Sequence, residues 1–171
     1  MGCATGIPRG LWEGGSMFRQ MRRFKQQLSQ EECEDILLSE RRGVLAVHGE
    51  DGYPYCVLVD YLYEQGKIYF HGAKLGHKID AIKADNRVSF TVFDQGVPVE
   101  GKVGPDVRSV IVFGRVSLLD TTPETIGIAR RLGEKYDPSG YVADEIKRTA
   151  ERIQLLELSI DHMSGKRVNE S

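Results

Sequence analysis

Residues 44–71 constrain the fold more than any other part of the chain, because three short β-forming runs follow one another with tight-turn sequences between them. The runs cover residues 44–48, 55–63 and 67–71, and the turns read Glu-Asp-Gly and Glu-Gln-Gly. This spacing is typical of strands joined by hairpins. The sequence therefore predicts a meander of three antiparallel strands.

Three more β-rich runs, at residues 88–93, 108–119 and 153–163, bring the predicted number of strands to six. Gly114 interrupts the longest run, where it predicts a bulge or a close approach of two backbones. A turn at Gly165-Lys166 is expected after the last run. Hairpin-joined strands of this number usually close into a small antiparallel barrel, because closure removes exposed edges.

Four helices are expected around this barrel, and two have clear start signals. Ser29 and Glu32 form a capping box for the first, which should end before Arg42-Gly43. Thr122 caps the third, with Pro123 at its first position. The sequence also predicts a short helix over 77–86, a stop of the third helix at 137–138, and a fourth helix over 141–152. The fold class is thus mainly β, with peripheral helices.

Length and charge favour one domain without a polyanionic or membrane partner. The 171 residues suit a single domain, and the net charge of −2 gives no basic bias towards nucleic acid. No run of about 20 apolar residues could cross a bilayer, and no signal-peptide core is present. Cys3, Cys33 and Cys56 form no CxxC pair, which suggests free thiols in a cytoplasmic protein. Residues 1–16 are expected to be a disordered extension of a single domain at 17–171.

The stretch "YFHGAKLGHK", residues 69–78, carries the candidate chemistry. A metal site is disfavoured because His71 and His77 do not have the spacing of a zinc-binding pair. A phosphate site fits better: the small residues Gly72 and Ala73 let backbone amides approach an anion, and Lys78 would lie in the first turn of the following helix. A glycine-rich connector with solvated lysines remains an alternative, since no Walker A pattern is present.

Five stretches in this order, "MFRQMRRFKQQLS", "GYPYCVLVDY", "KIYFHGAKLGHKIDAIKADNRVSFTVF", "RSVIVFGRVSLLD" and "LELSIDHMSGK", span nearly everything from Met17 to Lys166. This series resembles the pyridoxamine 5'-phosphate oxidase-like superfamily of FMN-binding split barrels, and within it the Nim-type nitroimidazole-resistance flavoproteins. The resemblance implies a six-stranded antiparallel split barrel. It also implies a homodimer with FMN at the subunit interface, each site being built from both chains.

By this resemblance, one strand lies against the isoalloxazine ring, the end of another continues that wall, a basic pair binds the FMN phosphate, and a third strand begins at the cofactor. Together with the small residues of the phosphate turn, the implied cofactor-binding residues are Tyr55, Cys56, Val57, Leu58, Phe70, His71, Gly72, Ala73, His77, Lys78, Arg108 and Ser109. His71 is also the best candidate for a catalytic role, orienting substrate or donating a proton, because its ordinary pKa lies near neutral pH.

Two departures argue against a true pyridoxamine phosphate oxidase. The stretch "YCVLVDY" lacks the basic residues that those enzymes carry there, and the single tryptophan, Trp12, lies in the N-terminal extension. The favoured function is an FMN-dependent, NADH- or NADPH-linked reduction of a small electron-poor molecule such as a nitroaromatic. The alternative is a non-catalytic protein that stores or senses FMN or haem on the same fold.

Overall fold

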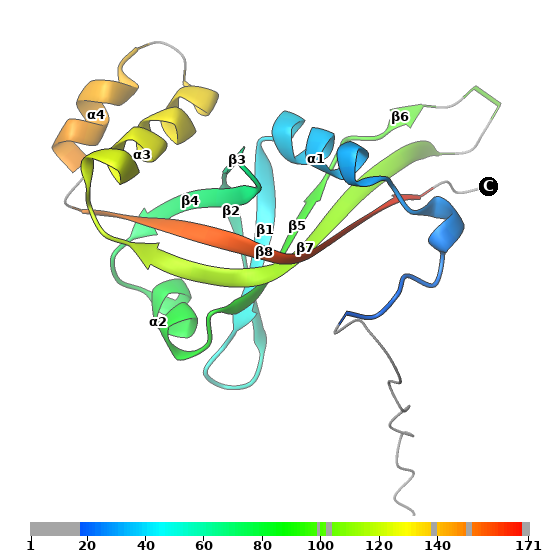
Figure 1. The fold of residues 1–171 in the computed structure, drawn as a ribbon, viewed down its shortest axis with the longest axis horizontal. Coiled ribbons are helices and arrows are strands. Elements are labelled where there is room, and N and C mark those ends of the chain that lie inside the picture. The colour runs from blue at the N-terminus through cyan, green and yellow to red at the C-terminus, as the bar shows by residue number, and fades with distance from the viewer. Residues whose placement is uncertain (1–17, 99, 102–103, 138–139, 150–151, 169–171) are drawn as a thin grey trace, which may run out of the picture.

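The strands form one antiparallel sheet that curls into a split barrel, with helices around it (Figure 1). The computed structural model describes residues 18–98, 100–101, 104–137, 140–149 and 152–168. The predicted disordered extension at 1–16 lies outside these ranges. The strands are β1 (Arg42–His48), β2 (Pro54–Asp60), β3 (Leu62–Glu64), β4 (Lys67–Ala73), β5 (Arg87–Phe93), β6 (Val97–Pro98), β7 (Pro105–Leu119) and β8 (Ile153–Val168).

The strand order is β2-β1-β5-β7-β8-β4-β3, and β6 pairs with β7 beside this path. β2 and β3 are therefore the two ends of the path, and the barrel stays open between them. Alternate residues of each strand point inward, as expected for a sheet with one face on a core. The fully buried interior includes Leu45, Phe90, Val112 and Leu158. The split-barrel prediction is confirmed at the level of a mainly antiparallel open barrel.

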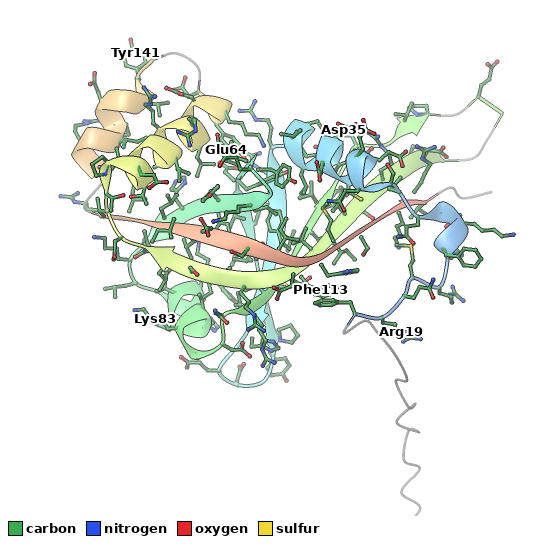
Figure 2. The ribbon with its side chains drawn as sticks, in the orientation of Figure 1. Arg19, Asp35, Glu64, Lys83, Phe113 and Tyr141 are labelled. Atoms are coloured by element: carbon green, nitrogen blue, oxygen red, sulfur yellow. The ribbon has the colours of Figure 1, made fainter. Side chains whose placement is uncertain are left out.

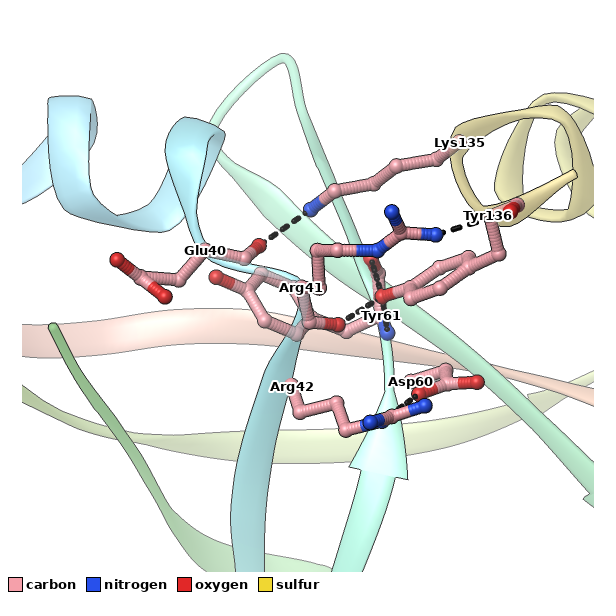
Figure 3. Close-up of polar contacts among 7 residues, drawn as sticks. All are labelled: Glu40, Arg41, Arg42, Asp60, Tyr61, Lys135 and Tyr136. Carbon is pink, nitrogen blue, oxygen red and sulfur yellow. Dashed lines mark hydrogen bonds and ion pairs between the residues drawn. The ribbon is translucent and has the colours of Figure 1, made fainter. Parts of the chain in front are cut away.

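The predicted count of six strands is wrong, because the described residues contain eight. One added strand is the two-residue β6. The other arises because the run at 55–63 is divided at Tyr61, whose backbone bonds to the Tyr136 hydroxyl rather than to a neighbouring strand (Figure 3). The ladder between β2 and β1 therefore stops at the pair formed by Asp60 and Arg42.

The turn expected at Gly165-Lys166 is also absent, since β8 continues through both residues to Val168. The first half of β7 pairs with this extension, for example Val110 with Gly165. A Cβ atom on Gly165 would lie 2.5 Å from the Cys33 sulfur, so glycine here allows α1 to pack closely on the strand. The predicted bulge at Gly114 is confirmed by a register shift between Phe113 and Gly114.

The helices are α1 (Gln30–Ser39), α2 (His77–Ala84), α3 (Pro123–Tyr136) and α4 (Val142–Thr149), with one 3-10 turn at Phe24–Gln26. Both predicted start signals are present. Ser29 forms a capping box with Glu32, and Thr122 forms one with Thr125 ahead of Pro123. None of the helices in the described ranges is long and apolar enough to span a membrane.

α3 and α4 lie side by side at one end of the barrel, next to β4 and β3 (Figure 1). Ile128 and Leu132 of α3 form a second apolar cluster with Tyr69 of β4 and Leu155 of β8. This cluster is on the outer face of β4, opposite the barrel core. His71, two residues after Tyr69, faces the same way as Tyr69, towards the α3–α4 pair.

Candidate functional site

The barrel opening between β2 and the end of β4 leaves strand edges without a sheet partner. Among the described strands, β2 pairs only with β1. β4 pairs with β8 along its length, but with β3 only over Lys67–Tyr69, so residues 70–73 have one free edge. Backbone N–H and C=O groups that find no partner strand are available to a ligand. The opening can therefore offer main-chain hydrogen bonds to a polar ring edge.

A cavity of about 380 Å³ lies at this opening, within the range of small-molecule sites. It is lined by Arg42, Leu58, Val59, Asp60, His71 and Lys78. These side chains come from the start of β1, the end of β2, the end of β4 and the start of α2. Arg42 and Asp60 face each other in the β1–β2 register and form an ion pair at 3.0 Å.

The start of α2 is suited to an anion. Gly76 precedes the helix with φ +126°, a backbone conformation that favours glycine, and provides no side-chain cap. α1 and α3, by contrast, both carry capping boxes. The first amides of a helix have no intrahelical partner, so those of His77 and Lys78 remain for another acceptor. The positive end of the helix dipole adds to this preference.

The Lys78 side chain folds back over β4. Its Nζ atom is 2.8 Å from the position that a Cβ atom on Gly72 would occupy, so a side chain at 72 would require the end of the Lys78 side chain to move. Lys78 makes no ion pair with a carboxylate in the part of the chain that the structure describes. A half-buried ammonium beside a glycine and an uncapped helix start fits a phosphate group.

The pKa values of Lys78 and His71, two of the basic groups at the cavity, are both lowered. Desolvation lowers the pKa of Lys78. Desolvation and the charge of Lys78 hold the pKa of His71 below its usual value, although Asp60 acts in the opposite direction. An anion bound between these groups would offset both effects, because it stabilises the charged form of each.

The structure distributes the predicted β2 and β4 residues over two faces. Tyr55 and Val57 pack against the barrel core, whereas Cys56 and Leu58 are exposed on the outer face. Phe70 is fully buried in the core, so only its backbone can line the opening. Tyr55 reaches α2, where its ring stacks on His77 with centroids 4.1 Å apart. This contact links β2 to the α2 start and orients the His77 imidazole.

Arg108 and Ser109 lie away from this cavity. They pair with Arg167 and Lys166 of β8 near one end of β7. The opposite end of β7 is the one close to the cavity, because Leu119 there pairs with Leu155, which is also the cross-strand partner of His71. Arg108 contacts Asp94 through both its amide and its guanidinium, at 2.9 and 2.8 Å. Burial acts to raise the pKa of Asp94, but hydrogen bonds from Arg108 and Gly96 hold it below its usual value.

Arg42 is the site residue that sequence reasoning missed. The sequence Arg42-Gly43 by itself predicts only the end of the first helix. A signal was present, because two consecutive basic residues directly before a strand place one of them on its outer face. In the described residues no three His, Cys, Asp or Glu side chains are close enough together to hold a metal ion.

The family model described as "Pyridoxamine 5'-phosphate oxidase" matches residues 29–167, which include the whole cavity lining. None of the curated proteins is similar enough in sequence to count as a match.

Several solved structures share this fold. A candidate 5-nitroimidazole antibiotic resistance protein from Bacteroides thetaiotaomicron is 20% identical, with a TM-score of 0.69 over 82% of this chain and 86% of that one. A FAD-binding protein from Mesorhizobium loti is 27% identical, with a TM-score of 0.61 over 84% and 97%. A FAD- and haem-binding protein from Mycobacterium smegmatis is 18% identical, with a TM-score of 0.69 over 85% and 74%.

Proposed function

Because the chain belongs to the pyridoxamine 5'-phosphate oxidase family, a family of flavin-binding split barrels, we propose that it binds FMN at the barrel opening and reduces a small electron-poor molecule. The observation that carries this proposal is the Lys78 ammonium, folded over Gly72 beside the uncapped start of α2. This group supplies a positive charge where a flavin phosphate needs one.

The residues at the opening divide into two groups under this proposal. Lys78 and the first amides of α2 bind the phosphate, with Arg42 near enough to add a second positive charge. Backbone groups at the free edges of β2 and β4 donate hydrogen bonds to the polar edge of the flavin ring and accept hydrogen bonds from it. Leu58 supplies an apolar contact to the ring. Gly72 keeps the space that the Lys78 side chain occupies.

Bound FMN would accept two electrons as a hydride from NADH or NADPH and pass them to an electron-poor substrate such as a nitroaromatic. His71 would orient that substrate, because it lines the cavity, and its lowered pKa favours this role over proton donation near pH 7. An imidazole that is neutral near pH 7 can donate a hydrogen bond without bringing a second positive charge to the ring.

The absorption spectrum of the purified protein is the first test. We expect flavin bands that bleach under anaerobic NADH or NADPH and return when a nitroaromatic is added. A colourless protein whose melting temperature does not rise with FMN would contradict the proposal. FMN and FAD are compared in the same thermal assay, since solved structures of this fold include FAD-binding proteins.

The second candidate is a non-catalytic carrier or sensor of flavin or haem. It is favoured by the solved structures of this fold that bind haem as well as FAD. A Soret band in place of flavin bands would support haem. Flavin bands that do not bleach with either nicotinamide cofactor would support a passive carrier.

We also propose a homodimer, supported by an apolar outer face on the sheet. Leu58 of β2, Phe93 of β5 and Phe113 of β7 are 67, 52 and 39% exposed there, a patch of the kind that marks an interface. A second copy of the chain that covers this patch would bring its own residues to the flavin. Arg108 would then reach the flavin from the second copy, since in a single chain it lies away from the cavity. Phe93→Glu should give a monomer in light scattering, whereas Glu50→Lys, an exposed change outside this patch, should not.

A further inference from the structure

The Tyr136 hydroxyl occupies the place where the next pair of the β1–β2 ladder would form. The ladder ends with Arg42 opposite Asp60. In an antiparallel register the next pair would be Arg41 and Tyr61. Instead, the hydroxyl accepts a hydrogen bond from the Tyr61 amide at 2.7 Å and contacts the carbonyl oxygens of Arg41 and Tyr61 (Figure 3). A side chain of α3 thus replaces a backbone pair at this end of the ladder.

A tyrosine hydroxyl suits this position because it has one donor and can also accept. It accepts from the Tyr61 amide and can donate to one of the two carbonyl oxygens. Burial raises the pKa of Tyr136, so the hydroxyl keeps its proton at neutral pH. The neighbouring Lys135 ammonium donates to the Glu40 carbonyl at 2.7 Å. The end of α3 therefore holds two consecutive carbonyl groups directly before β1, those of Glu40 and Arg41.

The two consecutive arginines at the start of β1 direct their side chains to different places. The Arg41 guanidinium donates to the Tyr136 carbonyl at 2.9 Å, and its central carbon lies 5.0 Å from the centre of the Tyr136 ring. Arg42 pairs with Asp60 and lines the cavity at the barrel opening. Because side chains alternate along a strand, a shift of β1 by one residue would exchange the two arginines. The contacts between Tyr136 and Arg41 oppose that shift.

We propose that Tyr136 is a positioning residue for the flavin site, which makes Arg42 rather than Arg41 the arginine that faces the flavin phosphate. This inference rests on the proposed flavin site. Tyr136 is not among the residues that line the cavity, so it acts on the cofactor through Arg42 and its partner Asp60. Without the hydroxyl, the Tyr61 amide loses its hydrogen-bond partner and the end of the ladder is free to shift.

Tyr136→Phe keeps the ring and removes only the hydroxyl. It should lower the preference for FMN over riboflavin at least about threefold, the effect of losing one partly exposed charged contact with the phosphate. Flavin fluorescence titration measures both affinities. Thr122→Ala is the matched control, because it removes the cap at the other end of the same helix. It should also lower stability, but it should leave the preference for FMN unchanged.

A double-mutant cycle separates positioning from a general loss of stability. Arg42→Ala alone should lower the preference for FMN, and addition of Tyr136→Phe should lower it no further, because the hydroxyl acts through Arg42. Addition of Tyr136→Phe to Lys83→Ala should lower the preference as much as it does in the wild type. Lys83 is exposed on α2 and does not line the cavity.

An unchanged preference in Tyr136→Phe, an equal fall in Thr122→Ala, or a further fall when Tyr136→Phe is added to Arg42→Ala would overturn the inference. Melting temperatures show which variants fold. Lys135→Met, which removes the contact with the Glu40 carbonyl, replaces Tyr136→Phe if that variant does not fold. Failure of the proposed function is distinguishable, because the wild type would then show no binding of FMN, and the inference would fail with it.

Discussion

The hydroxyl group of Tyr136 accepts a hydrogen bond from the Tyr61 amide at 2.7 Å and lies 2.9 Å from the Tyr61 carbonyl oxygen (Figure 3). It also contacts the Arg41 carbonyl. Lys135 adds a second link, since its ammonium donates to the Glu40 carbonyl at 2.7 Å and lies over the Tyr61 ring. The end of α3 is thereby attached to the segments that begin β1 and follow β2, next to the proposed flavin site.

Tyr136→Phe should destabilise the protein by about 1–3 kcal/mol, because the substitution leaves the buried Tyr61 amide without its partner. Urea unfolding measures this change. Tyr141→Phe is the control, since Tyr141 is 76% exposed and should tolerate loss of its hydroxyl. Equal stability of the two variants would show that the Tyr136 hydroxyl does not hold α3 in place.

Gly114→Ala should cost about 1–3 kcal/mol, the range for forcing extra bulk into a packed interior. The new Cβ would lie 2.1 Å from the Ser159 carbonyl oxygen, which is backbone and cannot turn away. Gly127→Ala is the opposite case, because it lies in α3 with its nearest neighbour 3.6 Å away. That variant should gain about 0.5–1 kcal/mol from helix propensity. Thermal unfolding of both variants measures the difference.

Lys78→Ala should weaken FMN binding at least about tenfold without changing the fold, because a charge-assisted hydrogen bond is lost. Riboflavin, which lacks the phosphate, should bind both proteins alike, so the wild-type preference for FMN over riboflavin should fall in the variant. Lys83→Ala tests general charge effects, since Lys83 is exposed on the same helix (Figure 2). Flavin fluorescence titration of the three proteins with FMN and riboflavin gives all six affinities. A retained preference for FMN in Lys78→Ala would remove Lys78 from the phosphate site.

Binding of FMN should take up protons below about pH 6.5, the ordinary pKa of histidine. In the flavin-free protein the pKa of His71 is lowered, so the unfolded chain protonates first as the pH falls. Its contribution to stability is therefore fully present above about pH 6.5 and decreases below that value. A bound phosphate would raise this pKa, so FMN affinity should increase as the pH falls.

Calorimetry in buffers of different ionisation enthalpy measures this proton uptake. His71→Gln should abolish it and flatten the pH dependence of affinity. Equal proton changes in the wild type and in His71→Gln would mean that the phosphate is not near His71, since the titration of the phosphate itself is common to both proteins.

Local signals in the sequence were sufficient for most of the secondary structure. The capping boxes at Ser29 and Thr122 involve residues three positions apart, and the bulge at Gly114 is marked by a glycine within a β run. These interactions depend on near neighbours or on the two-residue period of a strand, both of which are visible in a single sequence. The proposal that 72–78 binds a phosphate is likewise suggested by small residues before a helix.

The tertiary structure decided what depends on contacts between distant residues. The division of β2 from β3 depends on a hydroxyl 75 residues away from Tyr61. The extension of β8 through Gly165 depends on pairing with β7 and on the packing of Cys33. Arg42 joins Lys78 at one cavity only because the barrel brings β1, β4 and α2 together. The sequence by itself thus determined most of the elements and indicated the proposed phosphate turn, because both depend on near neighbours, whereas the residues that surround this turn were decided by contacts between distant segments.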